Sequence, residues 1–178
     1  VPYLTLEEIK QLCVVARKRR CGERDSLLIK ALFETGLRVS ELISVTPAKI
    51  QTFEGHAVIS VRRKGEKKEA MTACPDNLAY MLKSYSYTKN LKPNDRIFNI
   101  TRQRAWQIVK EIGLQAGFTK KIWCHLFRHS DAIYRLRMTG NPKALQHHLN
   151  HRSPIMTLRY LATLTYEDSL RIMQGVEF

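Results

Sequence analysis

Apolar residues recur every three or four positions along most of this chain, which is the spacing of one buried face of an α-helix. Thr5 and Glu8 have the spacing of a capping box, and the apolar positions behind them predict a first helix over about 6–19. The same pattern predicts further helices from Asp25 or Ser26 to a cap at Gly36, from Ser40 to just before Pro47, and over about 75–85, 101–116, 125–138, 142–149, 154–160 and 167–173.

The period of the pattern changes once, after Pro47. Residues 57–61 are rich in β-branched side chains, residues 64–67 have the composition of a turn, and residues 68–72 would form a returning strand. This segment therefore predicts a basic β-hairpin. Because no linker or internal repeat interrupts the pattern, we expect one mainly α-helical (α+β) domain over 1–178 with a small antiparallel sheet.

The charge balance of the chain is unusual for a globular domain. Its 178 residues include 30 Lys and Arg against 16 Asp and Glu, which gives a formal net charge of +14. A field of this sign favours a polyanionic partner, with nucleic acid as the first candidate and an anionic membrane surface as the second.

The cysteines and the lack of long apolar runs indicate the compartment. The four cysteines are widely spaced and none forms a C-x-x-C pair, so free thiols of an intracellular protein are expected rather than disulfides. No stretch of about 18 apolar residues is present, and we therefore expect a soluble, cytoplasmic chain without a membrane contact. The first residue is Val1, which indicates a piece of a longer protein.

Five of the six histidines lie between His125 and His151, which sets this stretch apart. His125 and His129 share a helical face and could bind a metal, but the glutamate of the H-E-x-x-H motif is missing. Cys124 and Asp131 are the only other ligand types close by. We therefore expect no metal site, and a zinc-dependent hydrolase remains a rival to be excluded by metal analysis.

Phosphodiester cleavage is the alternative chemistry for this stretch. Negative charge builds on the phosphorus centre during such a reaction, and arginine suits it because its planar fork stays charged and can bind two oxygens. The reaction also needs a nucleophile and a proton donor for the departing oxygen. Arg, Lys, His and Tyr side chains are sufficient for a metal-free enzyme.

Five short segments contain these residue types in a fixed order. They are Thr35–Leu42 (TGLRVSEL), Arg63–Lys68 (RKGEKK), His125–Ser130 (HLFRHS), Leu149–Ser153 (LNHRS) and Tyr160, which stands nine residues after His151. In order and spacing they resemble the motifs of the tyrosine recombinases, the phage-integrase family. The resemblance covers nearly the whole chain and implies the helical catalytic domain of enzymes that break and rejoin DNA.

The resemblance implies a role for each matching residue. Tyr160 would be the nucleophile that forms a 3′-phosphotyrosine, Arg38 and Arg128 would hold the non-bridging oxygens, and Lys64 would protonate the 5′-oxygen. Lys67 or Lys68 could also take the place of Lys64, because both follow it closely in the basic hairpin. Because the phosphotyrosine keeps the bond energy, the strand would be resealed without ATP, metal or another cofactor.

Three further residues are implied to support this chemistry. His125 would assist proton transfer or phosphate binding, His151 would hydrogen-bond the phosphate, and Glu41 would help to order the site. His147 or His148 could be mistaken for His151, and Asn150 replaces the usual glycine before it. Asparagine tolerates left-handed backbone angles, so the turn at this position is expected to survive.

DNA contacts outside the site are expected to be electrostatic. Candidates for contacts with the DNA backbone are basic side chains in three places: the hairpin, the helix start near 101 and the loop near 120. The helix start, including Gln103, could also contact bases in the major groove. The alternative for this helix start is a solvated helix face. The set is Lys67, Lys68, Arg102, Gln103, Arg104, Lys120 and Lys121.

The expected function is site-specific DNA recombination or integration on double-stranded DNA. The resemblance implies a C-terminal catalytic domain without the family's N-terminal DNA-binding domain, monomeric in isolation and tetrameric when two DNA sites are paired. Residues 161–178 would form an exchangeable tail with one apolar face, composed of Leu161, Leu164, Leu170, Ile172 and Met173. A type IB topoisomerase and a non-catalytic DNA-binding module of the same fold are the other rivals.

Overall fold

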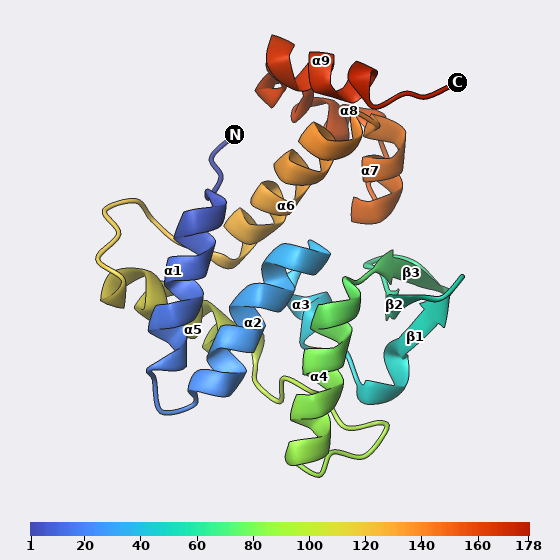
Figure 1. Cartoon of the computed structure of the whole chain (residues 1–178). Coiled ribbons are helices and arrows are strands. Elements are labelled where there is room, and N and C mark those ends of the chain that lie inside the picture. Colours follow the sequence, from blue (N-terminus) through green and yellow to red (C-terminus); the bar gives the residue numbers. More distant parts are fainter.

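Helices dominate the fold, and a three-stranded sheet lies at one side (Figure 1). The structure is a computed structural model that describes residues 1–178. In chain order the elements are α1 (Leu6–Arg17), α2 (Gly22–Thr35), α3 (Val39–Leu42), η1 (Pro47–Lys49), β1 (Ile50–Phe53), β2 (His56–Arg62), β3 (Glu69–Ala73), α4 (Asp76–Thr88), α5 (Arg102–Gln115), α6 (Cys124–Thr139), α7 (Pro142–Leu149), α8 (Pro154–Leu158), η2 (Leu161–Thr163) and α9 (Tyr166–Gln174).

The helix caps that the sequence predicts are present. The Thr5 hydroxyl accepts from the backbone N–H of Glu8, and the Glu8 carboxylate accepts from the backbone N–H of Thr5. Gly36 ends α2 in the left-handed conformation, with φ +65°. The capping box satisfies backbone N–H groups that lack partners inside α1, and the left-handed conformation of Gly36 ends α2.

The start of α2 differs from the sequence prediction. The helix begins at Gly22, one turn before Asp25, and Asp25 is buried inside it. Its carboxylate is paired with Arg19 at 2.9 Å and with Arg24 at 2.9 Å. Asp25 therefore does not act as the N-terminal cap, because it lies within the first turn of α2, where Arg19 and Arg24 neutralise its charge.

The sheet contains one strand more than the predicted hairpin. Its order is β1-β2-β3, with both pairs antiparallel, and Phe53 lies opposite His56 across the tight turn that joins β1 to β2. Only the first residue of β1, Ile50, is buried. The strand was missed because an edge strand with one buried position has no alternating pattern. The returning strand β3 begins at Glu69, so Lys68 belongs to the turn.

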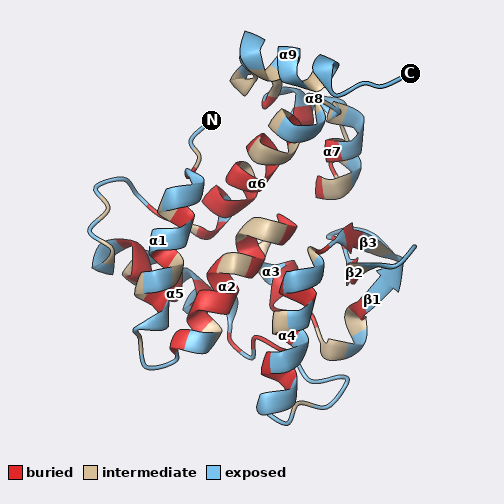
Figure 2. Ribbon diagram, viewed as in Figure 1, coloured by how far each residue is buried: buried red, intermediate tan, exposed pale blue.

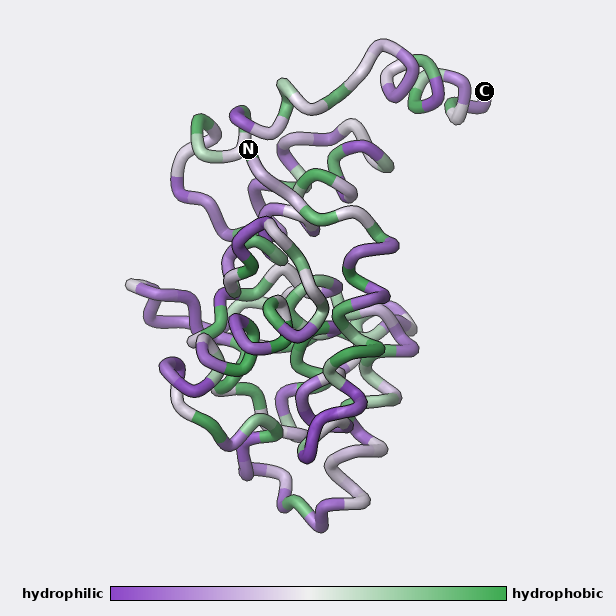
Figure 3. Tube along the Cα trace, turned by 90° about the vertical axis from the view of Figure 1, so that its left-hand side faces the viewer, coloured by the Kyte–Doolittle hydropathy of each residue, from purple (hydrophilic) through white to green (hydrophobic).

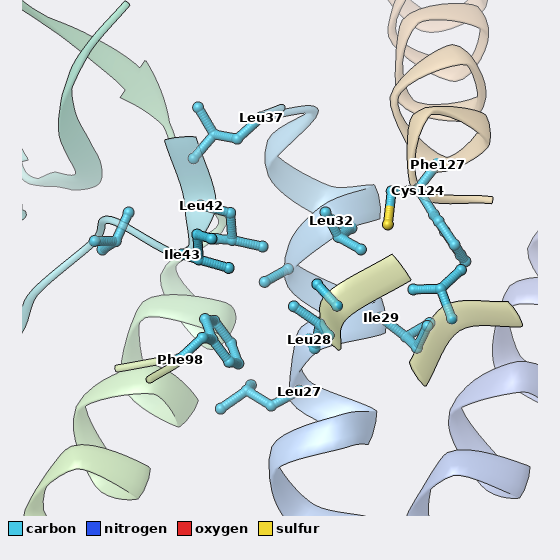
Figure 4. Packing of buried hydrophobic residues seen from close by; sticks show 14 of the residues in the cluster. Leu27, Leu28, Ile29, Leu32, Leu37, Leu42, Ile43, Phe98, Cys124 and Phe127 are labelled. Carbon is cyan, nitrogen blue, oxygen red and sulfur yellow. The ribbon is translucent and has the colours of Figure 1, made fainter. Parts of the chain in front are cut away.

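The main hydrophobic core surrounds α2. In Figure 4, Leu28 and Leu32 of α2 lie between Leu42 of α3 on one side and Phe127 of α6 on the other. Buried positions line the inner faces of these helices, and exposed positions face outwards (Figure 2). Because α2 is packed on several sides, it provides the rigid support for the turn that follows it.

A second, smaller cluster lies where α6 meets the last part of the chain. It contains Ala132, Ile133 and Leu136 of α6, Leu145 and Leu149 of α7, and Tyr160. The cluster joins the C-terminal elements to α6 and holds Tyr160 inside the protein.

The apolar residues of the C-terminal tail do not form the single face predicted for them. Leu161 and Leu164 pack against the second cluster, whereas Leu170 and Met173 of α9 are exposed. Ile172 packs against Gly140 at the end of α6. In Figure 3, α9 beside the C-terminus alternates between hydrophobic and hydrophilic segments. None of the helices has both the length and the apolar composition needed to cross a membrane.

Candidate active site

Arg38 lies in the turn between α2 and α3, where Gly36 makes the chain reverse. Its backbone N–H donates to Glu41 Oε1 at 2.9 Å, and its Nη1 lies 3.9 Å from Glu41 Oε2. The Arg38 side chain is half-buried, and Glu41 is buried. The sequence prediction that Glu41 orders this part of the site therefore has a physical basis, because its carboxylate fixes the Arg38 backbone.

Arg63 is a buried arginine that the sequence did not single out. Its Nη1 donates to both Glu41 oxygens at 3.2 and 3.3 Å, and its Nη2 donates to Thr72 Oγ1 and to the backbone oxygen of His148 at 2.9 Å. Burial lowers the pKa of Arg63, and the charge of Glu41 opposes this shift. Arg63 thereby connects the hairpin to α3 and α7, directly before Lys64.

Arg128 lies at the centre of the site and is 2% exposed. Its Nη1 donates to the backbone oxygen of Gly36 at 2.6 Å, and its Nη2 donates to that of Leu149 at 2.7 Å. Burial, followed by repulsion from Arg38, lowers its pKa to about 10, so it remains charged at neutral pH. The two carbonyls use two of its five N–H groups, which leaves others for an anion.

His151 follows α7 in the turn that Asn150 makes possible. Asn150 adopts the left-handed conformation with φ +53°, which confirms that asparagine replaces glycine here without loss of the turn. His151 is buried, and its Nδ1 lies 2.8 Å from Thr157 Oγ1, which fixes the ring. Burial, followed by the charge of Arg128, lowers the pKa of His151 to about 4.

The neighbouring histidines of α7 do not take the place of His151. His148 bonds Asp131 at 3.0 Å, and Asp131 also accepts from Arg135 at 2.7 Å. His147 is exposed. His148 therefore has a supporting position behind the site, where it holds α7 against α6.

Tyr160 is completely buried, and its hydroxyl has two polar neighbours. His129 Nδ1 lies 2.7 Å from Tyr160 Oη, and Arg159 Nη2 donates to the same oxygen at 2.9 Å. The Arg159 guanidinium also lies over the Tyr160 ring, 4.9 Å from its centroid. Sequence reasoning missed both neighbours, although His129 shares a helical face with His125.

His125 lies at the start of α6, beside His129. The two rings pack edge to face, with centroids 4.8 Å apart. Partial burial, followed by the charges of Arg128 and Arg38, lowers the pKa of His125 to about 4. No three His, Cys, Asp or Glu side chains come together in a way that could hold a metal ion.

Lys64 is exposed in the turn between β2 and β3 and has no bond to the other site residues. The turn nevertheless lies beside the site, because a Cβ atom on Gly65 would collide with the guanidinium of Arg152, next to His151. Lys67 and Lys68 are exposed farther along the same turn. The structure thus brings together Arg38, Glu41, His125, Arg128, His151 and Tyr160, and places Lys64 at their margin.

The first turns of α5 border the same site. Arg102 and Trp106 line a pocket of about 250 Å³ with Arg38 and His125, and Gln103 is exposed beside them. Arg104 is paired with Glu111 at 3.4 Å, and Lys120 is paired with Glu8 at 2.6 Å. Of the predicted DNA contacts, Arg102 therefore shares a pocket with site residues, whereas Arg104 and Lys120 already have acidic partners.

Comparisons with known proteins agree with this arrangement. The sequence model described as "Phage integrase family" matches residues 2–167, nearly the whole chain. The chain belongs to this family. It is 30% identical over 174 residues to the tyrosine recombinase XerD of Chlorobaculum tepidum, a match that covers 88% of the chain and 56% of that protein.

A shorter family member is similar over most of its own length. The type 1 fimbriae regulatory protein FimE of Escherichia coli K12 is 25% identical over 170 residues, covering 90% of the chain and 85% of FimE. By contrast, the chain spans about half the length of the XerD relatives it matches.

Solved structures share the fold of this family member. A XerH site-specific recombinase bound to a palindromic difH substrate aligns with a TM-score of 0.78 at 23% identity, covering 98% of this chain and 52% of that one. The catalytic domain of bacteriophage HP1 integrase aligns with a TM-score of 0.71 at 23% identity, covering 96% and 94%. The expected helical catalytic-domain fold is therefore confirmed.

Proposed function

We propose that this chain cleaves and rejoins double-stranded DNA at specific sites through a covalent bond between Tyr160 and a 3′-phosphate. The observation that carries the proposal is the cluster of cations around Tyr160. Arg159 donates to the Tyr160 hydroxyl, and burial followed by the charges of Arg128, Arg38 and Arg159 lowers the pKa of the neighbouring His125. Glu41 is the only carboxylate paired with any of the three arginines. Such an excess of fixed positive charge suits a phosphodiester and its transition state.

Each side chain has a defined task in this reaction. Arg38 and Arg128 hold the non-bridging oxygens, while the ring of His151, fixed by Thr157, donates a hydrogen bond to one of them. His125 assists at the rim of the pocket that it shares with Arg38. The phosphorus–5′-oxygen bond breaks as the Tyr160 oxygen attacks, and the departing oxygen takes a proton from Lys64.

The burial of Tyr160 imposes a conformational step on this reaction. With Tyr160 fully enclosed, a phosphodiester cannot reach its oxygen until the surrounding segment moves. The moving part includes Arg159 and α8, because Arg159 covers the Tyr160 ring and α8 precedes it directly. DNA binding at the cationic cluster would supply the free energy for this displacement.

DNA and further copies of this chain are the proposed partners. Two solved structures of this fold are XerH bound to difH DNA and a λ integrase dimer bound to a core site. Ile155 and Leu158 of α8, and Leu170 and Met173 of α9, are exposed apolar positions in the C-terminal part of the chain. In a tetramer that pairs two DNA sites, these positions would be covered by a neighbouring copy, with residues 161–178 as the exchangeable tail.

The experiment first selects, from DNA of random sequence, a site that the protein binds. This site is then built into a nicked suicide duplex. Formation of an SDS-resistant protein–DNA adduct, lost in Tyr160→Phe, supports the proposal. DNA that is bound but never trapped would refute it and favour a binding module. In a second arm, dependence of strand exchange on two copies of the site separates a recombinase from a topoisomerase, which would relax a one-site plasmid.

A further inference from the structure

The hydroxyl of Tyr160 has two neighbours with different hydrogen-bonding abilities. Arg159 Nη2, at 2.9 Å, can only donate, because a guanidinium has no free lone pair. The Tyr160 oxygen therefore accepts from Arg159. Its own proton has one remaining partner, His129 Nδ1 at 2.7 Å, because the enclosed side chain has no access to water.

His129 is well suited to accept this proton. If its Nδ1 carried a hydrogen, the Tyr160 proton would be buried without an acceptor, which is rare in folded proteins. The neutral ring with its hydrogen on Nε2 satisfies both groups. Burial, followed by the positive fields of His125 and Arg159, lowers the pKa of His129 to about 4, so the ring is a free base at neutral pH.

We propose that His129 is a further catalytic residue, which takes the phenolic proton of Tyr160 as the DNA strand is cleaved. This inference rests on the proposed function. The bond from the Tyr160 oxygen to phosphorus forms while its proton moves to His129 Nδ1, and the phosphorus–5′-oxygen bond breaks while Lys64 protonates the departing oxygen. Resealing returns both protons, so the two strand transfers balance.

The low basicity of the free His129 ring does not prevent this step. The proton moves as the oxygen binds phosphorus, when the oxygen loses its own basicity. A bound phosphodiester also places negative charge beside the ring, which favours its protonated form.

The same contacts have a rival explanation with the opposite consequence. His129 and Arg159 could instead be a clasp that stores Tyr160 away from DNA. Removal of His129 would then release the nucleophile and accelerate cleavage, whereas loss of a proton acceptor slows it. The direction of the rate change therefore distinguishes the two explanations.

The test compares single-turnover cleavage of the selected suicide duplex by wild type, His129→Asn and His129→Ala between pH 6 and pH 9. Asparagine keeps a hydrogen bond to Tyr160 but cannot take its proton. His56→Asn is the matched control, because His56 is exposed and bonded to Asp76 on the sheet side of the protein.

We expect His129→Asn to bind DNA normally and to cleave about 10²- to 10⁴-fold more slowly than wild type near neutral pH, the usual contribution of a general base. Its rate should rise about tenfold per pH unit, because an external base such as hydroxide must then take the phenolic proton in place of His129. Wild type and His56→Asn should show a much weaker dependence on pH.

Two results would overturn the inference while leaving the proposed function intact. One is a wild-type rate and pH profile in His129→Asn, and the other is faster cleavage by His129→Ala. Absence of any wild-type adduct on bound DNA would instead refute the proposed function, and this inference with it.

Discussion

Gly36 is the residue at which fold and site depend on each other most closely, and Gly36→Ala tests that dependence. Its φ of +65° disfavours a side chain, and an added Cβ would lie 2.9 Å from Asp131 Cγ and 3.2 Å from His148 Nε2. Asp131 cannot move aside cheaply, because Arg135 and His148 both hold its carboxylate. The substitution therefore combines backbone strain with a collision against fixed atoms.

The size of the effect follows from these two contributions. A left-handed conformation costs an L-residue about 1–2 kcal/mol, and overpacking a filled site costs about 1–3 kcal/mol more. Gly36→Ala should thus lower the free energy of unfolding by about 2–5 kcal/mol. Gly117→Ala is the matched control, because Gly117 has φ +76° and no atom within 4 Å of an added Cβ, so only the strain of about 1–2 kcal/mol remains.

Urea unfolding followed by circular dichroism measures both variants. Cleavage should also fall in folded Gly36→Ala, because the Gly36 carbonyl accepts from Arg128 and Arg38 lies two residues later. If Gly36→Ala and Gly117→Ala were destabilised equally and cleaved DNA equally well, the packing account of this turn would be wrong.

Three further predictions concern charge. Arg128→Lys should reduce the rate of single-turnover cleavage about 100-fold or more, because an ammonium cannot reach the Gly36 and Leu149 carbonyls together and each lost charged hydrogen bond costs about 1.5–3 kcal/mol. An unimpaired variant would contradict the central role of Arg128. The melting temperature should fall as pH drops from about 6.5, the ordinary histidine pKa, towards 4, because folded His151 with its pKa of about 4 binds fewer protons than the unfolded chain; His151→Asn should reduce this slope in part, because the pKa values of His125 and His129 are lowered in the same way, and an unchanged slope would exclude His151. DNA affinity should fall steeply between about 50 and 200 mM salt, as counterion release requires; affinity independent of salt would refute an electrostatic footprint.

The helices were predictable because their signals are local. Periodic apolar positions, the Thr5–Glu8 capping box and the glycine cap at Gly36 lie within a few residues of the structure that they specify. The left-handed turn at Asn150 was predictable for the same reason. Strand β1 was not, because an edge strand with one buried residue has no pattern of its own.

The residues missed in the site depend on contacts between distant segments. Arg63 appeared to belong to an exposed basic turn, but its partners are Glu41, Thr72 and the backbone of His148. His129 was considered only beside His125, although its hydrogen bond is to Tyr160. Sequence patterns identify the residue types that phosphate chemistry needs, whereas the pairing of each residue is set by tertiary packing.

The covalent bond to Tyr160 is the central claim, and locating the modification on the trapped adduct tests it most directly. Nuclease treatment of the adduct leaves a short nucleotide, and digestion after Arg and Lys yields the peptide 160–171, which also contains Tyr166. Tyr166 is 81% exposed, whereas Tyr160 is buried, so accessibility alone would favour modification of Tyr166. Fragment mass spectra should place the nucleotide on Tyr160 and none on Tyr166, and a nucleotide found on Tyr166 or on any other residue would contradict the account.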